Sequence, residues 1–384
     1  MPRLSERTAD LRASPVRAML EASQRPEVIS FAGGLPDFES FADLALPPPP
    51  RELLQYGPTE GERDLREAIA GELAAIGLPC PPERILLLSG SQQGIDLAAK
   101  LVVDRGTGVA VESPSYLAAL QVFRFFGADF RLMRRDDPAK GWSQDPPAIA
   151  YVTPTFQNPT GECWTAAERA RLAAACDAHD VILFEDDPYR DLAYEPCDRQ
   201  PACAQVRRAS WIYQSSFSKT VAPGLRLGFL AASEDLFTPL TRLKQASDLH
   251  SNRLSQWTVL QYLKDPGRPA RVARIVAGYK RKRDLFAAAL EKHLGGLADW
   301  QVPPGGLFFW VTLRNGVKPQ ALLDLALPRG VLFTPGEHFL AEEGESPAIR
   351  LNFSAADPAD AERGLAILGG LLRGMATAPA VTGV

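Results

Sequence analysis

The sequence contains 384 residues, of which 46% are hydrophobic and 23% are charged, with a formal net charge of -4 at pH 7. This profile is typical of a globular protein that is long enough for a large core and two domains. The mild acidity gives no support for nucleic acid or an anionic membrane as a partner. No apolar run approaches the roughly 20 residues of a membrane helix, so we expect no membrane span.

Neither a targeting segment nor a metal site is indicated by the sequence. The first 20 residues contain several arginines but no apolar core, which argues against a secretory signal. The four histidines are scattered without the paired spacing of metal ligands, so no metal is expected. The cysteines form no CxxC pair and are odd in number, which favours reduced thiols in a cytoplasmic protein. They are Cys80, Cys163, Cys176, Cys197 and Cys203.

Short apolar runs alternate with helical patterns over the first two thirds of the chain. The proline run at 47–50 cannot lie inside a helix, and we expect it to join an N-terminal arm (1–45) to a large domain (46–270). The Ser113-Pro114 pair is expected to begin a helix. Continuous apolar strands between helices predict an α/β fold with a mostly parallel sheet covered on both faces. The expected strands are 85–89, 108–112, 148–153, 181–185, 211–215 and 226–232, and helical patterns cover 92–104, 113–127 and 165–180.

The pattern changes beyond residue 270. A long amphipathic helix is predicted at about 271–294, where Gly295-Gly296 ends it, and a final helix at about 358–373. Three strand-like segments lie between them, at 303–313, 331–336 and 348–354. This arrangement predicts a second, smaller α+β domain over 271–384.

Polar motifs follow four of the predicted strands in the large domain. They are GSQQG after the first, QNPTG after the third, DDPY after the fourth and SFSK after the fifth. In open α/β sheets, ligands bind beyond the carboxyl ends of the strands. The sequence therefore predicts a ligand site at that edge of the sheet.

Lys219 stands in the last of these motifs, after Ser216 and Ser218, and a Pro-Gly turn then leads to Arg226. A lysine that forms a Schiff base must lose its proton readily, which requires a partly buried, electropositive site. Hydroxyl groups and an arginine near such a lysine can also bind a phosphate. Without further context, a solvated lysine in a loop is the better explanation of the motif.

The segment Ser89–Gly94 lies between a predicted strand and a predicted helix. The N-terminus of a helix presents unpaired N–H groups and the positive end of the helix dipole, which favour a phosphate. The alternative is a serine N-cap with glycines that allow a tight turn.

Asp186 and Asn158 follow two neighbouring predicted strands. A carboxylate at the mouth of a buried strand is costly unless it is paired, and a protonated pyridine nitrogen would pair with it. An Asp-Asp-Pro turn is the alternative, and alternation along the strand does not decide whether Asp186 or Asp187 points inward. Asn158 lies in a turn-forming segment, where its amide could also bind a ligand.

Together these elements resemble the fold-type-I aminotransferases of class I/II, which depend on pyridoxal 5'-phosphate (PLP). The likeness is greatest to the subgroup of 2-aminoadipate, kynurenine and aromatic aminotransferases, and it extends from about residue 14 to residue 373. It implies a mostly parallel seven-stranded sheet in the large domain and a homodimer with active sites at the subunit interface. The matching segments are 31–37, 55–69, 89–96, 112–116, 156–161, 185–189, 216–229, 303–310 and 350–354.

The resemblance also implies a role for each residue that matches a family motif. Lys219 would carry PLP as a Schiff base and, once freed, move a proton as acid and base. Asp186 would pair with the pyridine nitrogen, and Asn158 and Tyr189 would bind the phenolate oxygen. The remaining cofactor contacts would be Tyr116 stacked on the ring, Ser91, Gln92, Ser216, Ser218 and Arg226 around the phosphate, and Tyr56 from the neighbouring subunit.

The substrate would be held by Arg350, whose planar guanidinium matches a carboxylate with two hydrogen bonds. Asn158 and Gly34 would join it, and Arg17, in an N-terminal segment that covers the site, would contact the distal end of the substrate. Taken alone, Arg350 could be a charge on an edge strand and Arg17 a solvated helix residue. The stretch 38–54 is shorter than is usual in the family and rich in proline, which affects the active-site entrance.

These implications predict an aminotransferase that moves the amino group of an L-amino acid to a 2-oxo acid, expected to be 2-oxoglutarate, by a ping-pong mechanism. The expected donor is aromatic, 2-aminoadipate-like or bulky aliphatic. A PLP-dependent lyase, decarboxylase or racemase on the same fold is the first alternative. A ligand-sensing domain of a transcription regulator is the second, although only about 15 residues precede the first match and leave no room for a DNA-binding domain.

Overall fold

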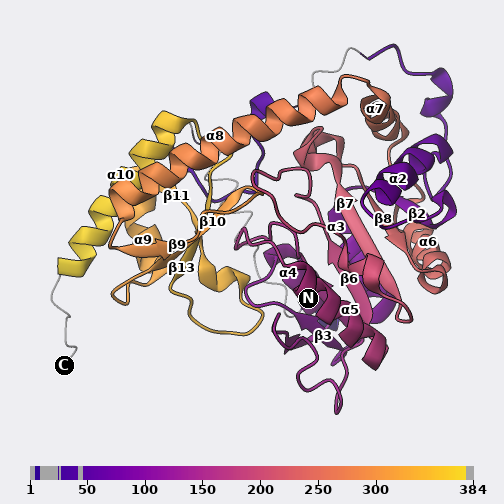
Figure 1. The fold of residues 1–384 in the computed structure, drawn as a ribbon, viewed down its shortest axis with the longest axis horizontal. Coiled ribbons are helices and arrows are strands. Elements are labelled where there is room, and N and C mark those ends of the chain that lie inside the picture. Colours follow the sequence, from indigo (N-terminus) through magenta and orange to yellow (C-terminus); the bar gives the residue numbers. More distant parts are fainter. Residues whose placement is uncertain (1–4, 9–24, 26, 42–45, 378–384) are drawn as a thin grey trace.

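The computed structural model describes residues 5–8, 25, 27–41 and 46–377, and it contains a large sheet and a smaller one (Figure 1). The seven strands of the large sheet lie in the order β2-β8-β7-β6-β5-β3-β4. Their bounds are β2 (Ile85–Leu88), β3 (Gly108–Val111), β4 (Asp129–Leu132), β5 (Ile149–Val152), β6 (Ile182–Asp186), β7 (Trp211–Ser216) and β8 (Gly228–Ala232). The predicted α/β fold with a mostly parallel seven-stranded sheet is thus confirmed.

The large sheet is antiparallel near one edge, and its opposite edge strand lacks the continuous apolar pattern. Strand β8 runs antiparallel to both β2 and β7, whereas the other neighbours are parallel. At the opposite edge, no apolar run predicts β4, because Asp129 and Arg131 alternate with its apolar residues. An edge strand with partly exposed side chains lacks the uninterrupted hydrophobic run that marks a buried parallel strand.

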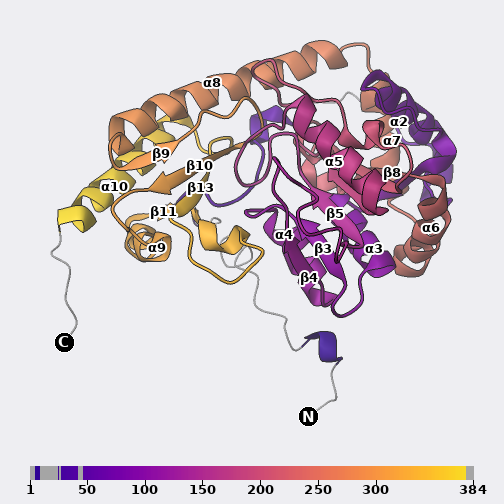
Figure 2. The same ribbon diagram turned by 60° about the horizontal axis from the view of Figure 1, so that its bottom comes forward.

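Six helices cover both faces of the large sheet (Figure 2). One face packs against α2, α5 and α7, and the other against α3, α4 and α6. Successive residues of each strand therefore enter different cores, as in Leu86 and Leu87 of β2. The helices are α2 (Arg63–Ala75), α3 (Ser91–Val102), α4 (Leu117–Phe125), α5 (Ala166–His179), α6 (Glu234–Asp248) and α7 (Arg253–Lys264).

One predicted helix start is wrong. Helix α4 begins at Leu117 and not at Ser113-Pro114, and Tyr116 before it has an extended backbone. The reason is a contact across the molecule, because the Ser115 N–H donates to the Phe339 carbonyl oxygen at 2.9 Å. This bond holds the segment after β3 against the small-sheet part of the chain before the helix begins.

The small sheet has the strand order β12-β13-β10-β9 and is covered by long helices. Helix α8 (Arg268–Leu294) has Gly295 as its C-cap, close to the predicted bounds. Strand β9 and helix α9 were not predicted, whereas the three strand-like segments contain β10, β11 with β12, and β13. The remaining bounds are β9 (Ala298–Trp300), β10 (Phe308–Leu313), α9 (Pro319–Ala326), β11 (Val331–Leu332), β12 (Thr334–Pro335), β13 (Ala348–Asn352) and α10 (Pro358–Thr377).

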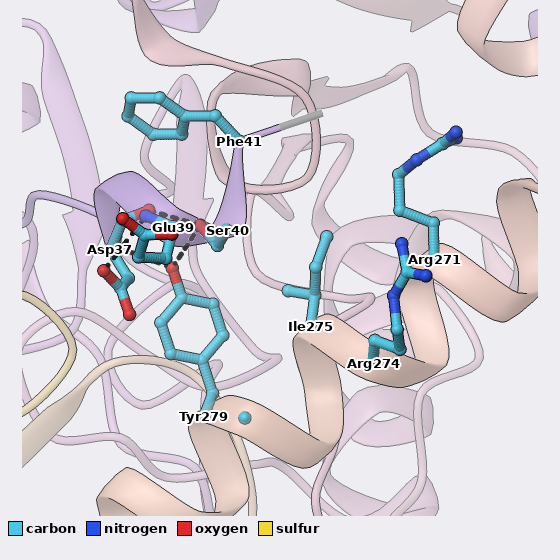
Figure 3. Close-up of a pocket in the computed structure, with 9 residues that line it drawn as sticks. Asp37, Glu39, Ser40, Phe41, Arg271, Arg274, Ile275 and Tyr279 are labelled. Atoms are coloured by element: carbon cyan, nitrogen blue, oxygen red, sulfur yellow. Dashed lines mark hydrogen bonds between the residues drawn. The ribbon is translucent and has the colours of Figure 1, made fainter. Parts of the chain in front are cut away.

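The N-terminal part of the chain is built into the small-sheet side. Strand β1 (Ile29–Ser30) pairs in parallel with β11. The next turn lies against α8, where the Tyr279 hydroxyl accepts from the Asp37 N–H and contacts the Ser40 hydroxyl, each at 2.8 Å (Figure 3). Lys282 pairs with Asp37 at 2.5 Å. Residues 31–36 lie between the β1–β11 pairing and the contacts of Asp37 with α8, and these two attachments fix their course along the small sheet.

Neither a membrane-spanning helix nor a cluster of metal-ligating side chains is found in the described part of the chain. Among the helices within the described ranges, none has the length and apolar character needed to cross a membrane. Over those same residues, no three histidine, cysteine or acidic side chains gather as a metal would require.

Neighbouring glycines in α10 allow a test of its packing on α8. A Cβ at buried Gly369 would lie 2.3 Å from the His293 carbonyl oxygen, whereas a Cβ at Gly370 meets nothing within 4 Å. We expect Gly369→Ala to lower the free energy of unfolding by about 1–3 kcal/mol, as overpacking does. Urea denaturation measures the change. Gly370→Ala is the matched control and should raise stability by up to about 1 kcal/mol through helix propensity; equal effects at both positions would contradict the packing.

Candidate active site

The predicted site residues converge where the strands of the large sheet end. Asp186 is the last residue of β6, and Lys219 ends the short 3-10 helix η6 (Phe217–Lys219) that follows β7. Asn158 lies in the loop after β5. From the small-sheet side, β13 contributes Arg350, and the segment after β1 contributes Gly34. The site is therefore enclosed by both sheets.

Lys219 occupies an electropositive position. Its Nζ donates a hydrogen bond to the Gly34 carbonyl oxygen at 2.8 Å and lies 5.8 Å from the centre of the Tyr189 ring. Burial lowers the pKa of Lys219 to about 8, with further lowering by the charges of Arg350 and Arg226. A sizeable fraction of this amine is therefore neutral near physiological pH, as a nucleophilic lysine requires.

Asp186 has one carboxylate oxygen bound and one unpaired. Its Oδ2 accepts from the Tyr151 hydroxyl at 2.8 Å, whereas its buried Oδ1 has no hydrogen-bond partner in the described structure. Burial raises the pKa of Asp186 to about 6, although the hydrogen bond from Tyr151 opposes the rise. A buried carboxylate oxygen without a donor fits a protonated ring nitrogen of a bound cofactor.

The neighbouring Asp187 points to a different set of partners. Its Oδ2 accepts from the Tyr213 hydroxyl and from Arg190 Nη1, each at 2.9 Å. Both aspartates are buried, so their different partners define their roles better than their exposure does. The geometry supports Asp186 as the aspartate that faces a ligand and Asp187 as part of a structural ion pair.

Gly90 and Arg226 lie together at the opposite end of the site, beside the start of α3. Gly90 precedes α3 with φ +86°, and a Cβ there would lie 2.5 Å from Arg226 Nη2. A Cβ at Gly228 would lie 2.9 Å from the Ser91 nitrogen, so that β8 also approaches this loop closely. Glycine is required at both positions, because a Cβ would collide with Arg226 or with the Ser91 nitrogen. The N-terminus of α3 and the Arg226 guanidinium together form a positively charged site suited to a phosphate.

Further predicted phosphate ligands line the same end. The Ser216 and Ser218 hydroxyls lie 2.9 Å apart, and the Tyr116 hydroxyl lies 3.4 Å from Gln92 Oε1. The pKa of Tyr116 is raised to about 12, mainly by burial. The phenol therefore stays neutral and can present an uncharged ring face to a ligand.

Arg350 lies on the small-sheet side of the site. It is 7% exposed, its Nη1 donates to Asn158 Oδ1 at 2.7 Å, and its Nε has no partner among the described residues. The Asn158 amide nitrogen in turn donates to the Tyr189 hydroxyl at 3.4 Å. Burial lowers the pKa of Arg350 to about 10, yet the group remains charged at neutral pH. A buried guanidinium without a carboxylate partner can receive an anionic ligand.

Tyr56 does not join this cluster. The Tyr56 side chain is 76% exposed, and its ring contacts His250 at 5.9 Å between ring centres. Arg17 lies outside the described residues. A cavity of about 390 Å³ is also separate from the cluster, because it lies between residues 37–41 and helix α8 (Figure 3).

Sequence reasoning missed three residues that shape the site. Tyr151 binds Asp186, Gln214 lies directly opposite Asp186 in the pairing of β6 with β7, and Phe308 packs against Arg350 with 4.4 Å from its ring centre to the guanidinium. For Tyr151 and Gln214 the sequence does contain a signal, because each places a polar group within an otherwise apolar strand, IAYV and WIYQSS. Such a group needs a buried partner.

Comparisons with known proteins show the family of this chain. The family model described as aminotransferase class I and II matches residues 48–368. The aromatic-amino-acid aminotransferase 1 of Thermococcus litoralis is 34% identical, over 91% of this chain and 89% of that protein. The 2-aminoadipate transaminase of Thermus thermophilus is 33% identical over 95% of each chain.

A solved structure gives the same result for the fold. The Pyrococcus horikoshii kynurenine aminotransferase, crystallised with PMP, kynurenine and its product, superimposes with a TM-score of 0.89. It is 31% identical, and the match covers 98% of both chains. This chain therefore belongs to the class I and II aminotransferases and is a PLP-dependent aminotransferase of fold type I.

Proposed function

We propose that the enzyme transfers the amino group of an aromatic, 2-aminoadipate-like or bulky aliphatic L-amino acid to 2-oxoglutarate by a ping-pong mechanism. The observation that carries the proposal is the grouping of Lys219, Asp186 and Arg350 around Tyr189: the Lys219 amine lies 5.8 Å from its ring centre, and the charges of Asp186 and Arg350 both act on the pKa of its hydroxyl. When bound, PLP supplies an electron sink for the bonds at the substrate α-carbon. The remaining chemistry belongs to side chains of this chain.

Lys219 is proposed as both the attachment point and the proton carrier. Its lowered pKa supports this role, because a neutral amine can accept the α-proton and the resulting ammonium can return it. Asp186 would hold its charge against the ring nitrogen, with Tyr151 fixing one carboxylate oxygen at 2.8 Å. The phosphate would be held by the start of α3 together with Ser91, Gln92, Ser216, Ser218 and Arg226.

Arg350 is proposed to bind the α-carboxylate of both the amino acid and the oxo acid. Its rigid position supports this role, since the guanidinium is fixed by Asn158 and lies over the Phe308 and Phe339 rings at 4.4 and 4.8 Å. Asn158 and Tyr189 would bind the phenolate oxygen of the cofactor from the same side. The names of the relatives support an aromatic or 2-aminoadipate-like donor.

We also propose a homodimer in which Tyr56 reaches the phosphate of the neighbouring subunit. Leu54 and Tyr56 are 72% and 76% exposed, which is unfavourable for large apolar side chains in a monomer. Their loop is nevertheless held firmly, because Arg253 Nη1 donates to the carbonyl oxygens of Glu52, Gln55 and Tyr56 at 2.6, 3.0 and 3.3 Å. A fixed loop that presents apolar side chains suits a subunit interface.

A panel of amino donors tests the reaction and its substrate class. We expect phenylalanine, kynurenine, 2-aminoadipate or leucine, each with 2-oxoglutarate, to yield the matching oxo acid and glutamate, with parallel lines in double-reciprocal plots. Without 2-oxoglutarate, one equivalent of oxo acid per active site should form. Pyruvate and ammonia from serine, with no glutamate formed from any donor, would favour the lyase alternative instead.

Replacing Lys219 tests the attachment point. Lys219→Ala should abolish transamination and should leave no cofactor on the protein after borohydride reduction, because the amine proposed to form the Schiff base is removed. Mass spectrometry of the reduced protein locates the label on wild-type Lys219. Lys318→Ala, on an exposed salt bridge, is the control and should label like the wild type. Covalent labelling of Lys219→Ala at another lysine with retained turnover would contradict the assignment.

The lowered lysine pKa predicts how cofactor attachment depends on pH. Only the neutral amine attacks the aldehyde, so the rate of PLP attachment to the apo protein should rise with pH through about 8 and then level off. Arg350→Gln removes a charge that disfavours the ammonium, and the midpoint should move to higher pH. Stopped-flow absorbance measures the rates. Arg314→Gln, at an exposed pair with Asp299, should leave the midpoint unchanged; equal shifts in both variants would refute the electrostatic cause.

A further inference from the structure

Lys244 is a fully buried lysine outside the reaction centre. Its side chain has no exposed surface, and its Nζ donates to Asp248 Oδ1 at 2.6 Å and to the Ser251 hydroxyl at 3.0 Å. Both groups lie near the C-terminal end of α6, the helix that packs beside α3. An ammonium removed from water must keep its partners, because an unpaired buried charge costs several kcal/mol.

Asp248 connects this lysine to the loop that begins α3. Its Oδ2 accepts from the Ser89 hydroxyl at 2.7 Å and from Gln93 Nε2 at 2.9 Å. Gln93 also accepts from the Ser89 N–H through Oε1 at 2.9 Å. The carboxylate therefore holds the loop on both sides of Ser91 and Gln92. Burial raises the pKa of Asp248, but hydrogen bonds from Lys244, Ser89 and Gln93 outweigh it and keep the pKa below its usual value.

Ser251 extends the network to the preceding strand. Its hydroxyl donates to the Leu87 carbonyl oxygen at 3.2 Å and lies 3.3 Å from the Ser89 hydroxyl. The loop after β2 is thus fixed to α6 and to the turn after it. Such support matters here because Gly90, within the loop, has a positive φ that the backbone must maintain beside Arg226.

We propose that Lys244 and Asp248 are positioning residues for the cofactor phosphate, acting through Ser89 and Gln93 on the loop that begins α3. The inference rests on the proposed phosphate contacts of Ser91 and Gln92. Neither charged group touches the cofactor. They hold the loop in its phosphate-binding conformation before the cofactor binds. Less free energy is then lost in ordering the loop when the phosphate binds.

The test compares a ligand that has a phosphate with one that lacks it. Dissociation constants of PLP and of pyridoxal are measured by reconstituting the full-length apo protein, together with the rate of PLP loss from the holoenzyme. Lys244→Met should weaken PLP binding about tenfold, the scale of losing a charge-assisted hydrogen bond, and leave pyridoxal binding within about twofold. Ser89→Ala, a milder variant that keeps the buried pair, should weaken PLP binding in the same direction by a smaller factor.

The matched control is another lysine–aspartate pair one helical turn apart. Lys100 and Asp96 lie 2.5 Å apart on α3 but are partly exposed and bind nothing in the loop, so Lys100→Met should bind both ligands as the wild type does. Unchanged PLP binding in Lys244→Met and Ser89→Ala, even with a lower melting temperature, would show a merely structural pair and overturn the proposal. Equal weakening of PLP and pyridoxal would overturn it too. Failure of the wild type itself to discriminate PLP from pyridoxal would instead refute the phosphate contacts.

Discussion

The desolvation of Lys219 is the constraint on which the rest of the active site depends. The amine is placed by the large sheet, but the groups that lower its pKa come from both sides of the site, with Arg226 before β8 and Arg350 on β13. The Gly34 carbonyl oxygen, which accepts its hydrogen bond, belongs to the N-terminal segment. A neutral, oriented amine is therefore available only when the small sheet and the N-terminal segment are packed against the large sheet, so folding and chemical competence are linked.

The proposed role of Asp186 sets the opposite requirement, because this carboxylate would have to remain charged in an equally buried place. Alternation along the chain makes this possible, because consecutive aspartates reach different partners. Each aspartate has one carboxylate oxygen without a hydrogen-bond partner among the described residues, but Asp187 forms an ion pair with Arg190, whereas Asp186 accepts only from the uncharged Tyr151 hydroxyl. A buried carboxylate without a cationic partner is unfavourable, and a cationic ring nitrogen bound to Asp186 as proposed would offset this cost. The charge distribution around Asp186 therefore supports the proposed cofactor contact.

The large sheet and most of the site could be predicted because their signals are local. Buried parallel strands give continuous apolar runs, and the motifs around Lys219, Asp186 and Asn158 follow those strands directly. Strand β4 and the start of α4 could not be predicted in the same way, since an edge strand is half polar and a bond from Ser115 to Phe339 crosses the molecule. The partners Tyr151 and Gln214 depend on strand register, which a single sequence does not specify.

The contacts that hold the proposed phosphate-binding loop join residues far apart in the sequence, and for this reason no sequence motif predicts them. Ser89 and Asp248 are 159 residues apart, and their contact depends on how α6 packs beside α3. The turn that follows α6 has a second task, because Arg253 at the start of α7 holds the loop that presents Tyr56. If Tyr56 reaches the neighbouring subunit as proposed, the short segment from Asp248 to Arg253 supports the phosphate end of its own site and also a contact to the partner's site. In the proposed dimer, a change in the conformation of this turn would affect the phosphate contacts of both sites, and dimer assembly and cofactor retention would then depend on each other.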